Sequence, residues 1–153
     1  MKAKPKRVVF AEGEEERAIR AAVNFRNAGL GTPVLIGRED TVKEAMARMG
    51  LGDEAGEGSG LEIHNARLSQ DNRRYVDLLY SRLQRRGSLQ RDCQRMVNQD
   101  RNVFAACMVA AGDADAMVTG LTRSFAVSYR DVTQVIEPDP ASIVFGLTTI
   151  VSR

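Results

Sequence analysis

The sequence has few of the residues on which several classes of protein depend. Its two cysteines, Cys93 and Cys107, lie far from any Cys-x-x-Cys or Cys/His cluster, and His64 is its single histidine. This argues against a disulfide framework and against a structural zinc site, and predicts reduced, buried thiols in a cytoplasmic protein. No serine, cysteine or carboxylate stands at a recognisable spacing from His64, so it supports no catalytic triad and is expected on a strand face.

Long apolar runs and a strong net charge are also missing. The longest apolar candidates, such as 103–111, fall well short of the roughly 18 residues that a membrane helix needs. The basic start of the chain is followed by only three strongly apolar residues, Val8 to Phe10, so no secretory signal is expected. The 22 basic and 20 acidic side chains leave a net charge of +2. Neither a nucleic acid nor a membrane is therefore expected as a partner.

What is present indicates a soluble α/β protein. The 153 residues are enough for about one domain, and 43% of them are apolar. Short apolar runs at 6–11 and 32–37 predict strands, and helical spacing over 14–28 joins them into a βαβ unit, which favours a parallel sheet. Further strands are expected at 61–64, 116–118 and 142–151. Further helices are expected at 42–49, at 69–87, from Ser88, from Asp100 and over 124–136.

Two local features refine this pattern. Thr41 and Glu44 fit a capping box at the start of the helix over 42–49. The glycine-rich stretch 52–60 lacks apolar side chains to pack and predicts a surface loop. A parallel sheet needs both faces covered, yet no helix follows the last β-prone run. The chain is therefore expected to be part of a larger unit, or a subunit whose partner supplies the missing layer.

The segment 113–124 is the best candidate for a binding site. A buried strand there is followed by a glycine, by residues with hydroxyl groups and by an arginine at the start of a helix. The backbone amides at a helix start are where proteins hold anions. The candidate anion-binding residues are Thr119, Gly120, Thr122, Arg123, Ser124 and Arg130. Arg130 lies about 9 Å along the helix from Ser124, so it reaches the same anion only if its side chain folds back. The alternative is an ordinary strand-to-helix turn with Ser124 as the cap.

Other candidates are weaker. Asp113 and Asp115 have no third ligand nearby, so they fit helix and strand ends better than a metal site, and no metal is predicted. Neither cysteine is expected to act as a nucleophile, because each falls on an apolar helix face. Six arginines between 81 and 101 can bind the phosphates of a nucleotide-like ligand or simply form a solvated helix face; they are Arg82, Arg85, Arg86, Arg91, Arg95 and Arg101.

Several motifs together resemble one known family. They are Val8-Val9-Phe10-Ala11-Glu12-Gly13-Glu14-Glu15, Pro33-Val34-Leu35-Ile36-Gly37, the helix end from Tyr80 to Gly87, and the segment from Gly112 to Gly120. This pattern resembles the phosphate acetyl/butyryltransferase family, and within it the version fused behind the catalytic domains of bacterial NADP-dependent malic enzymes. The likeness covers nearly the whole chain. Residues 1–153 would form one lobe, the first half, of the family's longer domain.

The resemblance implies a fold and a ligand. The implied fold is a three-layer α/β unit with a mostly parallel sheet, of the isocitrate/isopropylmalate dehydrogenase-like kind found in phosphotransacetylases. Acyl-CoA and phosphate would bind in a cleft between two lobes, with a homo-oligomer as the common assembly. The family's small hydroxyl residue, glycine, serine and anion-binding arginine match Thr119, Gly120, Ser124 and Arg130. Ser124 and Arg130 would thus be the family-like catalytic positions.

The chain also departs from the pattern of the active transferases. These have an arginine four residues before the glycine that ends the long helix, where this chain has Leu83. They usually have a histidine and an aspartate where this chain has Arg123 and Val127. Loss of a preorganised cation puts turnover in doubt. The favoured function is therefore a regulatory domain of a malic enzyme, with acetyl-CoA as effector; the alternative is an active phosphate acetyltransferase. The parent enzyme would use NADP and a divalent metal, with no cofactor in this segment.

Overall fold

The computed structural model describes residues 5–55, 58–139, 141 and 143–144. Its described strands are β1 (Lys6–Phe10), β2 (Gly31–Ile36), β3 (Glu62–His64) and β4 (Ala116–Val118). The helices are α1 (Glu16–Asn27), α2 (Glu39–Arg48), α3 (Asn72–Leu83), α4 (Gln90–Gln99), α5 (Arg101–Ala110) and α6 (Phe125–Thr133), with short 3-10 turns η1 (Gly52–Ala55) and η2 (Gln84–Arg86). All three strand pairings in the described part are parallel, which confirms the three-layer α/β prediction.

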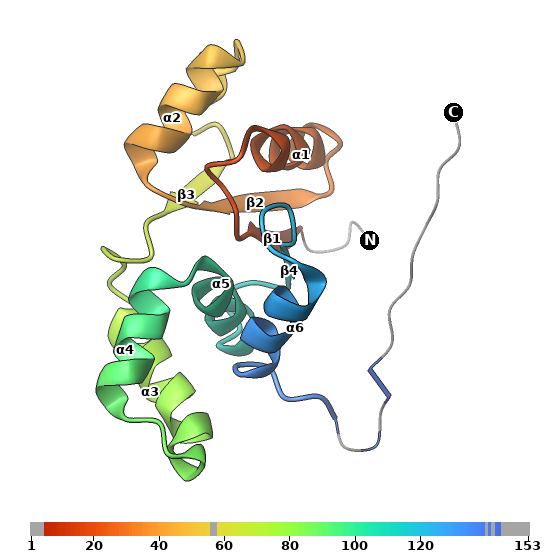
Figure 1. Ribbon diagram of the computed structural model, residues 1–153. Coiled ribbons are helices and arrows are strands. Elements are labelled where there is room, and N and C mark those ends of the chain that lie inside the picture. The colour runs from red at the N-terminus through yellow and green to blue at the C-terminus, as the bar shows by residue number, and fades with distance from the viewer. Residues whose placement is uncertain (1–4, 56–57, 140, 142, 145–153) are drawn as a thin grey trace.

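Helices cover both faces of the sheet, as Figure 1 shows with α1 and α2 above it and α3, α4 and α5 below. Because successive side chains of a strand point to opposite faces, the apolar runs supply both layers. Phe10 and Leu35 pack under α1 and α2, where Ile19 is fully buried. Val9 and Val34 pack against the other helices, including the buried Phe104 of α5. The continuous apolar runs of β1 and β2 are thus the mark of strands buried on both sides.

The strand order is β3-β2-β1-β4. From β1 the chain proceeds through β2 to β3, and it then returns through α3, α4 and α5 to place β4 on the other side of β1. The order of the strands therefore reverses between β1 and β4, which is the switch point of the sheet. In open α/β sheets, ligands commonly bind outside the carboxyl ends of the strands at such a point.

Several local expectations need correction. The capping box at Thr41 and Glu44 is wrong, because α2 already begins at Glu39 and its N-cap, Arg38, makes no side-chain capping bond. Carboxylates at Glu39 and Asp40 favour this earlier start, since they face the positive end of the helix dipole. The long helix expected over 69–87 begins at Asn72 and tightens into η2 before Gly87. The expected loop 52–60 contains η1. The predicted strand 142–151 lies largely outside the described residues.

Other expectations are confirmed. Asp100 caps α5 by accepting hydrogen bonds from the amides of Asn102 and Val103 at 2.9 and 3.2 Å. Ser124 caps α6. His64 lies in β3, partly exposed, with Nε2 3.2 Å from the Glu62 carboxylate. Within the part of the chain that the structure describes, no helix has both the length and the apolar character needed to cross a membrane.

The two cysteines are free and buried, as the sequence predicted. Burial raises the pKa of Cys107 to about 12, with a neighbouring arginine opposing the rise, and burial also raises the pKa of Cys93. We expect neither thiol to react with iodoacetamide at neutral pH in the folded protein, and both to react in denaturant. Mass spectrometry of the alkylated protein measures this, and rapid labelling of the folded chain would contradict it.

Candidate functional site

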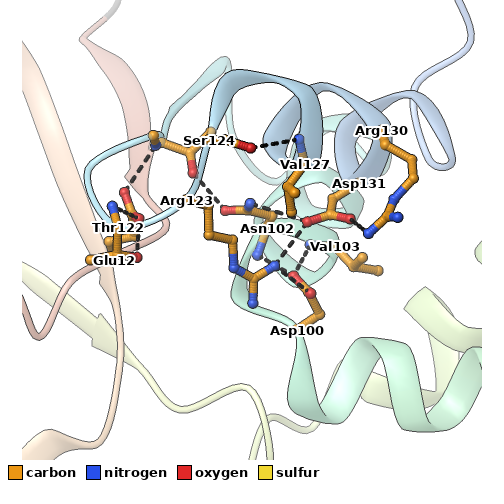
Figure 2. A network of polar contacts seen from close by, with 12 residues as sticks. Glu12, Asp100, Asn102, Val103, Thr122, Arg123, Ser124, Val127, Arg130 and Asp131 are labelled. Atoms are coloured by element: carbon orange, nitrogen blue, oxygen red, sulfur yellow. Dashed lines mark hydrogen bonds and ion pairs between the residues drawn. The ribbon is translucent and has the colours of Figure 1, made fainter.

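The turn after β4 binds an anion, and that anion belongs to the protein itself. Glu12, which follows β1, accepts hydrogen bonds from the amides of Gly120, Leu121 and Thr122 at 2.7 to 2.9 Å. The Thr122 hydroxyl donates a fourth bond at 2.5 Å. Figure 2 shows the carboxylate of Glu12 beside Thr122. Successive backbone amides thus surround a carboxylate, an arrangement known as a nest. The contact joins the ends of β1 and β4 at the switch point of the sheet.

The Glu12 side chain is held as an ion inside the protein. The residue is only 5% exposed. Burial by itself raises the pKa of Glu12, but the bonds from Thr122, Leu121 and Gly120 outweigh it, and the pKa lies below its ordinary value. A carboxylate that accepts several backbone amides is stabilised in its charged form. Glu12 is therefore ionised at neutral pH, and it satisfies donors that would otherwise lack a partner.

Two glycines make this closure possible. A side chain at Gly13 would place its Cβ 2.7 Å from the Ile36 amide nitrogen, so only glycine lets the turn after β1 lie against β2. Gly120 has φ of +106°, a conformation that other residues rarely adopt, and it turns the chain so that successive amides point at Glu12. Of the features that suggested an anion site, Gly120 and the amides that follow it serve this internal contact.

Arg123 is the centre of a second polar cluster beside the turn (Figure 2). Its guanidinium lies 2.6 Å from the Asp100 carboxylate and 2.8 Å from that of Asp131. Asp131 is 5% exposed and Asn102 is 1% exposed, and the Asn102 amide donates to Asp131 at 3.5 Å. The bond to Asp100, with the charge of Asp131 beside it, raises the pKa of Arg123. This cluster ties the start of α5 to α6.

The remaining candidates divide between internal and exposed positions. The Thr119 hydroxyl donates to Asn102 at 2.6 Å, and the Ser124 hydroxyl accepts from the Val127 amide at 3.5 Å. Arg130 is different, because its side chain is 68% exposed and reaches only to within 3.5 Å of Asp131. Of the six residues named from the sequence, Arg130 alone presents a largely exposed cation. Binding of an external anion by this segment stays a prediction, since the amides of residues 120–122 already hold Glu12.

An apolar pocket opens next to the turn on the α6 side. Its volume is about 410 Å³, and it is lined by Thr119, Gly120, Phe125, Ser128, Tyr129 and Val132. Phe125 is 78% exposed and stacks on Tyr129 with ring centroids 5.7 Å apart. Exposed stacked aromatics beside a hollow are typical of a surface that contacts something else. Arg130 follows Tyr129 on α6, but it is not among the residues that line the pocket, because consecutive helix residues point to different sides of the helix.

The other sequence candidates have structural partners. Asp113 accepts from the Tyr75 hydroxyl at 2.7 Å, and Asp115 joins the start of β4 to Lys6 at 2.8 Å. Across the described ranges no three His, Cys, Asp or Glu side chains gather as metal ligands do. Members of the arginine-rich stretch that have partners are Arg82 on the Val135 carbonyl, Arg86 3.8 Å from Glu137, Arg95 3.9 Å from Asp92, and Arg101 2.6 Å from Glu14.

Sequence reasoning missed the residues that occupy the site. From the sequence, Glu12 stands only within a family motif and has no predicted role, and no role is predicted for Asp131 or Asn102. A signal for Glu12 did exist, because the carboxyl ends of neighbouring parallel strands meet at one edge of a sheet. An acid directly after β1 can therefore meet the amides after β4. The signal requires knowing that β4 pairs with β1, which the sequence does not state.

The fold and a match to a known family together define the class of protein. The chain belongs to the phosphate acetyl/butaryl transferase family, whose model matches residues 1–153. The family resemblance expected from the sequence is thereby confirmed.

Within that class, the chain is similar to a segment of longer malic enzymes. It is 50% identical over 149 residues to the NADP-dependent malic enzyme of Rhizobium meliloti strain 1021, a match that covers 97% of this chain and 19% of that protein. The phosphate acetyltransferase of Staphylococcus aureus strain MRSA252 is 27% identical over 134 residues, which cover 88% of this chain and 39% of that protein. The chain thus spans about a fifth of the first relative and well under half of the second.

A solved structure supports the same fold. The EutD phosphotransacetylase from Staphylococcus aureus superposes with a TM-score of 0.79 at 26% identity, and the match covers 92% of this chain and 40% of that one. The described sheet and its helices therefore correspond to part of a phosphotransacetylase fold.

Proposed function

We propose that this chain is an acyl-CoA-responsive regulatory domain of an NADP-dependent malic enzyme. The observation that carries the proposal is the 50% identity to such an enzyme along 97% of the chain. The similarity to phosphate acetyltransferases is much lower, at 27%. The parent polypeptide would oxidatively decarboxylate malate with NADP and a divalent metal in the cytoplasm, and this domain would sense acetyl-CoA in a homo-oligomer.

The site supports binding better than acyl transfer. The position at which the family's active members carry an arginine is Leu83, the last residue of α3, which is 5% exposed and packs in the core. Arg123, at the position of the family's histidine, is engaged by two carboxylates. Transfer between a thioester and phosphate spreads negative charge over oxygens and needs preorganised cations directed at them. Neither of these positions supplies such a cation here.

The α6 surface is the proposed contact for the acyl-CoA. The apolar pocket lined by Phe125, Tyr129 and Val132 suits the uncharged part of such a molecule, and the exposed Arg130, which lies on α6 outside the pocket lining, suits a phosphate. Regulation requires that the ligand favour one state of the whole enzyme over another. The connection of α6 to α5 through Arg123 offers a rigid path from this surface into the domain.

The decisive experiment measures both activities on the full-length protein. We expect acetyl-CoA to change the rate of NADPH formation from malate, and acetyl-CoA with phosphate to release free thiol at far less than the ~1 s⁻¹ at the low end of common enzymatic turnover. Arg130→Gln should weaken the response to acetyl-CoA severalfold and leave the rate without effector unchanged.

The matched control is Arg20→Gln, an exposed arginine of α1 that removes the same charge elsewhere. It should respond as the natural protein does. Thiol release at ordinary enzymatic rates would instead establish the second candidate, an active phosphate acetyltransferase, which the 27% identity to the Staphylococcus aureus enzyme favours. A malate reaction indifferent to acetyl-CoA would contradict the regulatory proposal.

A further inference from the structure

A second pocket lies at the carboxyl ends of β1, β2 and β3, away from the turn and α6. Its volume is about 420 Å³. Its lining includes three arginines, Arg38, Arg67 and Arg101, together with Glu14 and Asn98, and the apolar side chains of Ile36 and Leu68. Four segments far apart in sequence meet there. This edge of a parallel sheet is where α/β proteins usually place their ligands, and the volume is in the range of small-molecule sites.

Glu14 holds two of the three arginines in place. Its side chain is 11% exposed, and its carboxylate lies 2.6 Å from Arg101 and 3.3 Å from the side chain of Arg38. The Arg38 amide donates a further bond at 2.8 Å. Each guanidinium has five N–H donors, so one carboxylate uses only a few of them. Glu14 therefore positions the two guanidinium groups and leaves most of their donors for another acceptor.

Arg67 adds a cation with no such restraint. Over the described ranges, no carboxylate lies within ion-pair distance of its guanidinium, and its backbone amide is fixed by the Asn65 side chain at 3.0 Å. Asn98 accepts from Asn72 at 3.0 Å through its side-chain oxygen, so its NH2 group is the one left to donate. The pocket thus gathers three guanidinium groups and amide donors against one carboxylate.

We propose that this pocket binds a diphosphate group carried by a small organic molecule. Guanidinium groups from three different segments match an anion with several oxygens and more than one charge, whereas a single carboxylate needs only one arginine. The volume exceeds that of a diphosphate alone, and Ile36 and Leu68 provide apolar contact for an organic part. The proposal does not rest on the proposed function, because the pocket shares no residue with the turn or with α6.

Calorimetric titration of the full-length protein with inorganic pyrophosphate tests the anion site. We expect saturable binding that weakens about tenfold or more in Arg67→Gln, since a charge-assisted hydrogen bond is lost. Arg67 is exposed and its side chain has no described partner that the fold needs, so the variant should fold as the natural protein does. Adenosine diphosphate should bind at least as tightly as pyrophosphate, because it adds an organic group.

Arg20→Gln is the control of equal charge change on α1, and its pyrophosphate affinity should stay within twofold of the natural protein. Absence of saturable binding would overturn the proposal. Equal pyrophosphate affinity in Arg67→Gln and the natural protein would also overturn it. Equal weakening in Arg67→Gln and Arg20→Gln would overturn it as well, because it would show that the anion is attracted by net charge only. Binding of pyrophosphate but not of adenosine diphosphate would overturn the assignment of an organic ligand. These results do not depend on whether malate turnover responds to acetyl-CoA.

Discussion

Replacing Glu12 with alanine is expected to destabilise the chain by about 3 kcal/mol, because it removes a buried charge and leaves its donors without their acceptor. Glu12 receives three backbone amides and the Thr122 hydroxyl, and it is 5% exposed. For a chain of this size such a loss lowers the melting temperature by roughly 6 to 12 °C. Urea unfolding followed by far-UV circular dichroism measures it.

The control is Glu15→Ala, which removes an exposed carboxylate that makes no capping bond at the start of α1. It should change the free energy of unfolding by less than about 0.5 kcal/mol, as surface substitutions usually do. Similar losses of unfolding free energy in the two variants would show that the contact of Glu12 with the turn stabilises the chain no more than an exposed carboxylate does.

The same contact has a defined dependence on pH. The pKa of Glu12 in the folded chain lies below its ordinary value of 4.5, because bonds from Thr122 and the amides outweigh burial. Its stabilisation is therefore complete above about pH 4.5 and is lost as the pH falls through the lowered folded-state pKa. The difference in unfolding free energy between the natural chain and Glu12→Gln should accordingly shrink in acid.

Arg123→Gln is the second substitution with a large expected effect. It removes the cation between Asp100 and Asp131 and leaves two carboxylates close together, one of them 5% exposed. Loss of one partner of a buried ion pair costs about 3 to 5 kcal/mol, but Arg123 is partly exposed and screened by water, so we expect about 2 kcal/mol. Denaturant unfolding gives the value, and α6 should lose protection from hydrogen exchange first.

A second variant separates the charge effect from loss of packing. Adding Asp131→Asn to Arg123→Gln removes the unpaired buried carboxylate and should restore part of the lost stability. The double-mutant cycle should therefore show a coupling energy well above zero, as contacting residues do. Strictly additive losses would mean that Arg123 acts through its packing alone.

The contact of Glu12 with the turn bears on function. Three amides at the switch point are the ones that a phosphate would otherwise use, and the carboxylate already occupies them. An incoming anion would have to displace Glu12 and would lose the stability that the contact provides. The ligand contacts proposed above therefore lie on surfaces that keep free donors, such as Arg130 on α6 and the arginines around Glu14.

Much of the fold could be predicted from sequence because its signals are local. The apolar runs of β1 and β2 with a helix between them favour a parallel pair, and Asp100 and Ser124 mark helix starts through capping. The start of α2 was misplaced because a hydroxyl at Thr41 resembled a cap, whereas acids one and two residues earlier already favoured the helix. These two local signals predict different starts for the helix, and the sequence does not show which of them prevails.

The chemistry of the site could be predicted only in part. Residue types and order alone predicted an anion at the segment 113–124 and left an ordinary strand-to-helix turn as the alternative, since a glycine and successive amides before a helix favour an anion in any fold. Which anion it holds depends on β4 pairing with β1, a contact between residues more than a hundred positions apart. The same holds for the arginines around Glu14, which meet only when the sheet and helices are packed. The direction in which the amides of the turn point is set by the local backbone, whereas the charged group that they bind is set by the tertiary structure.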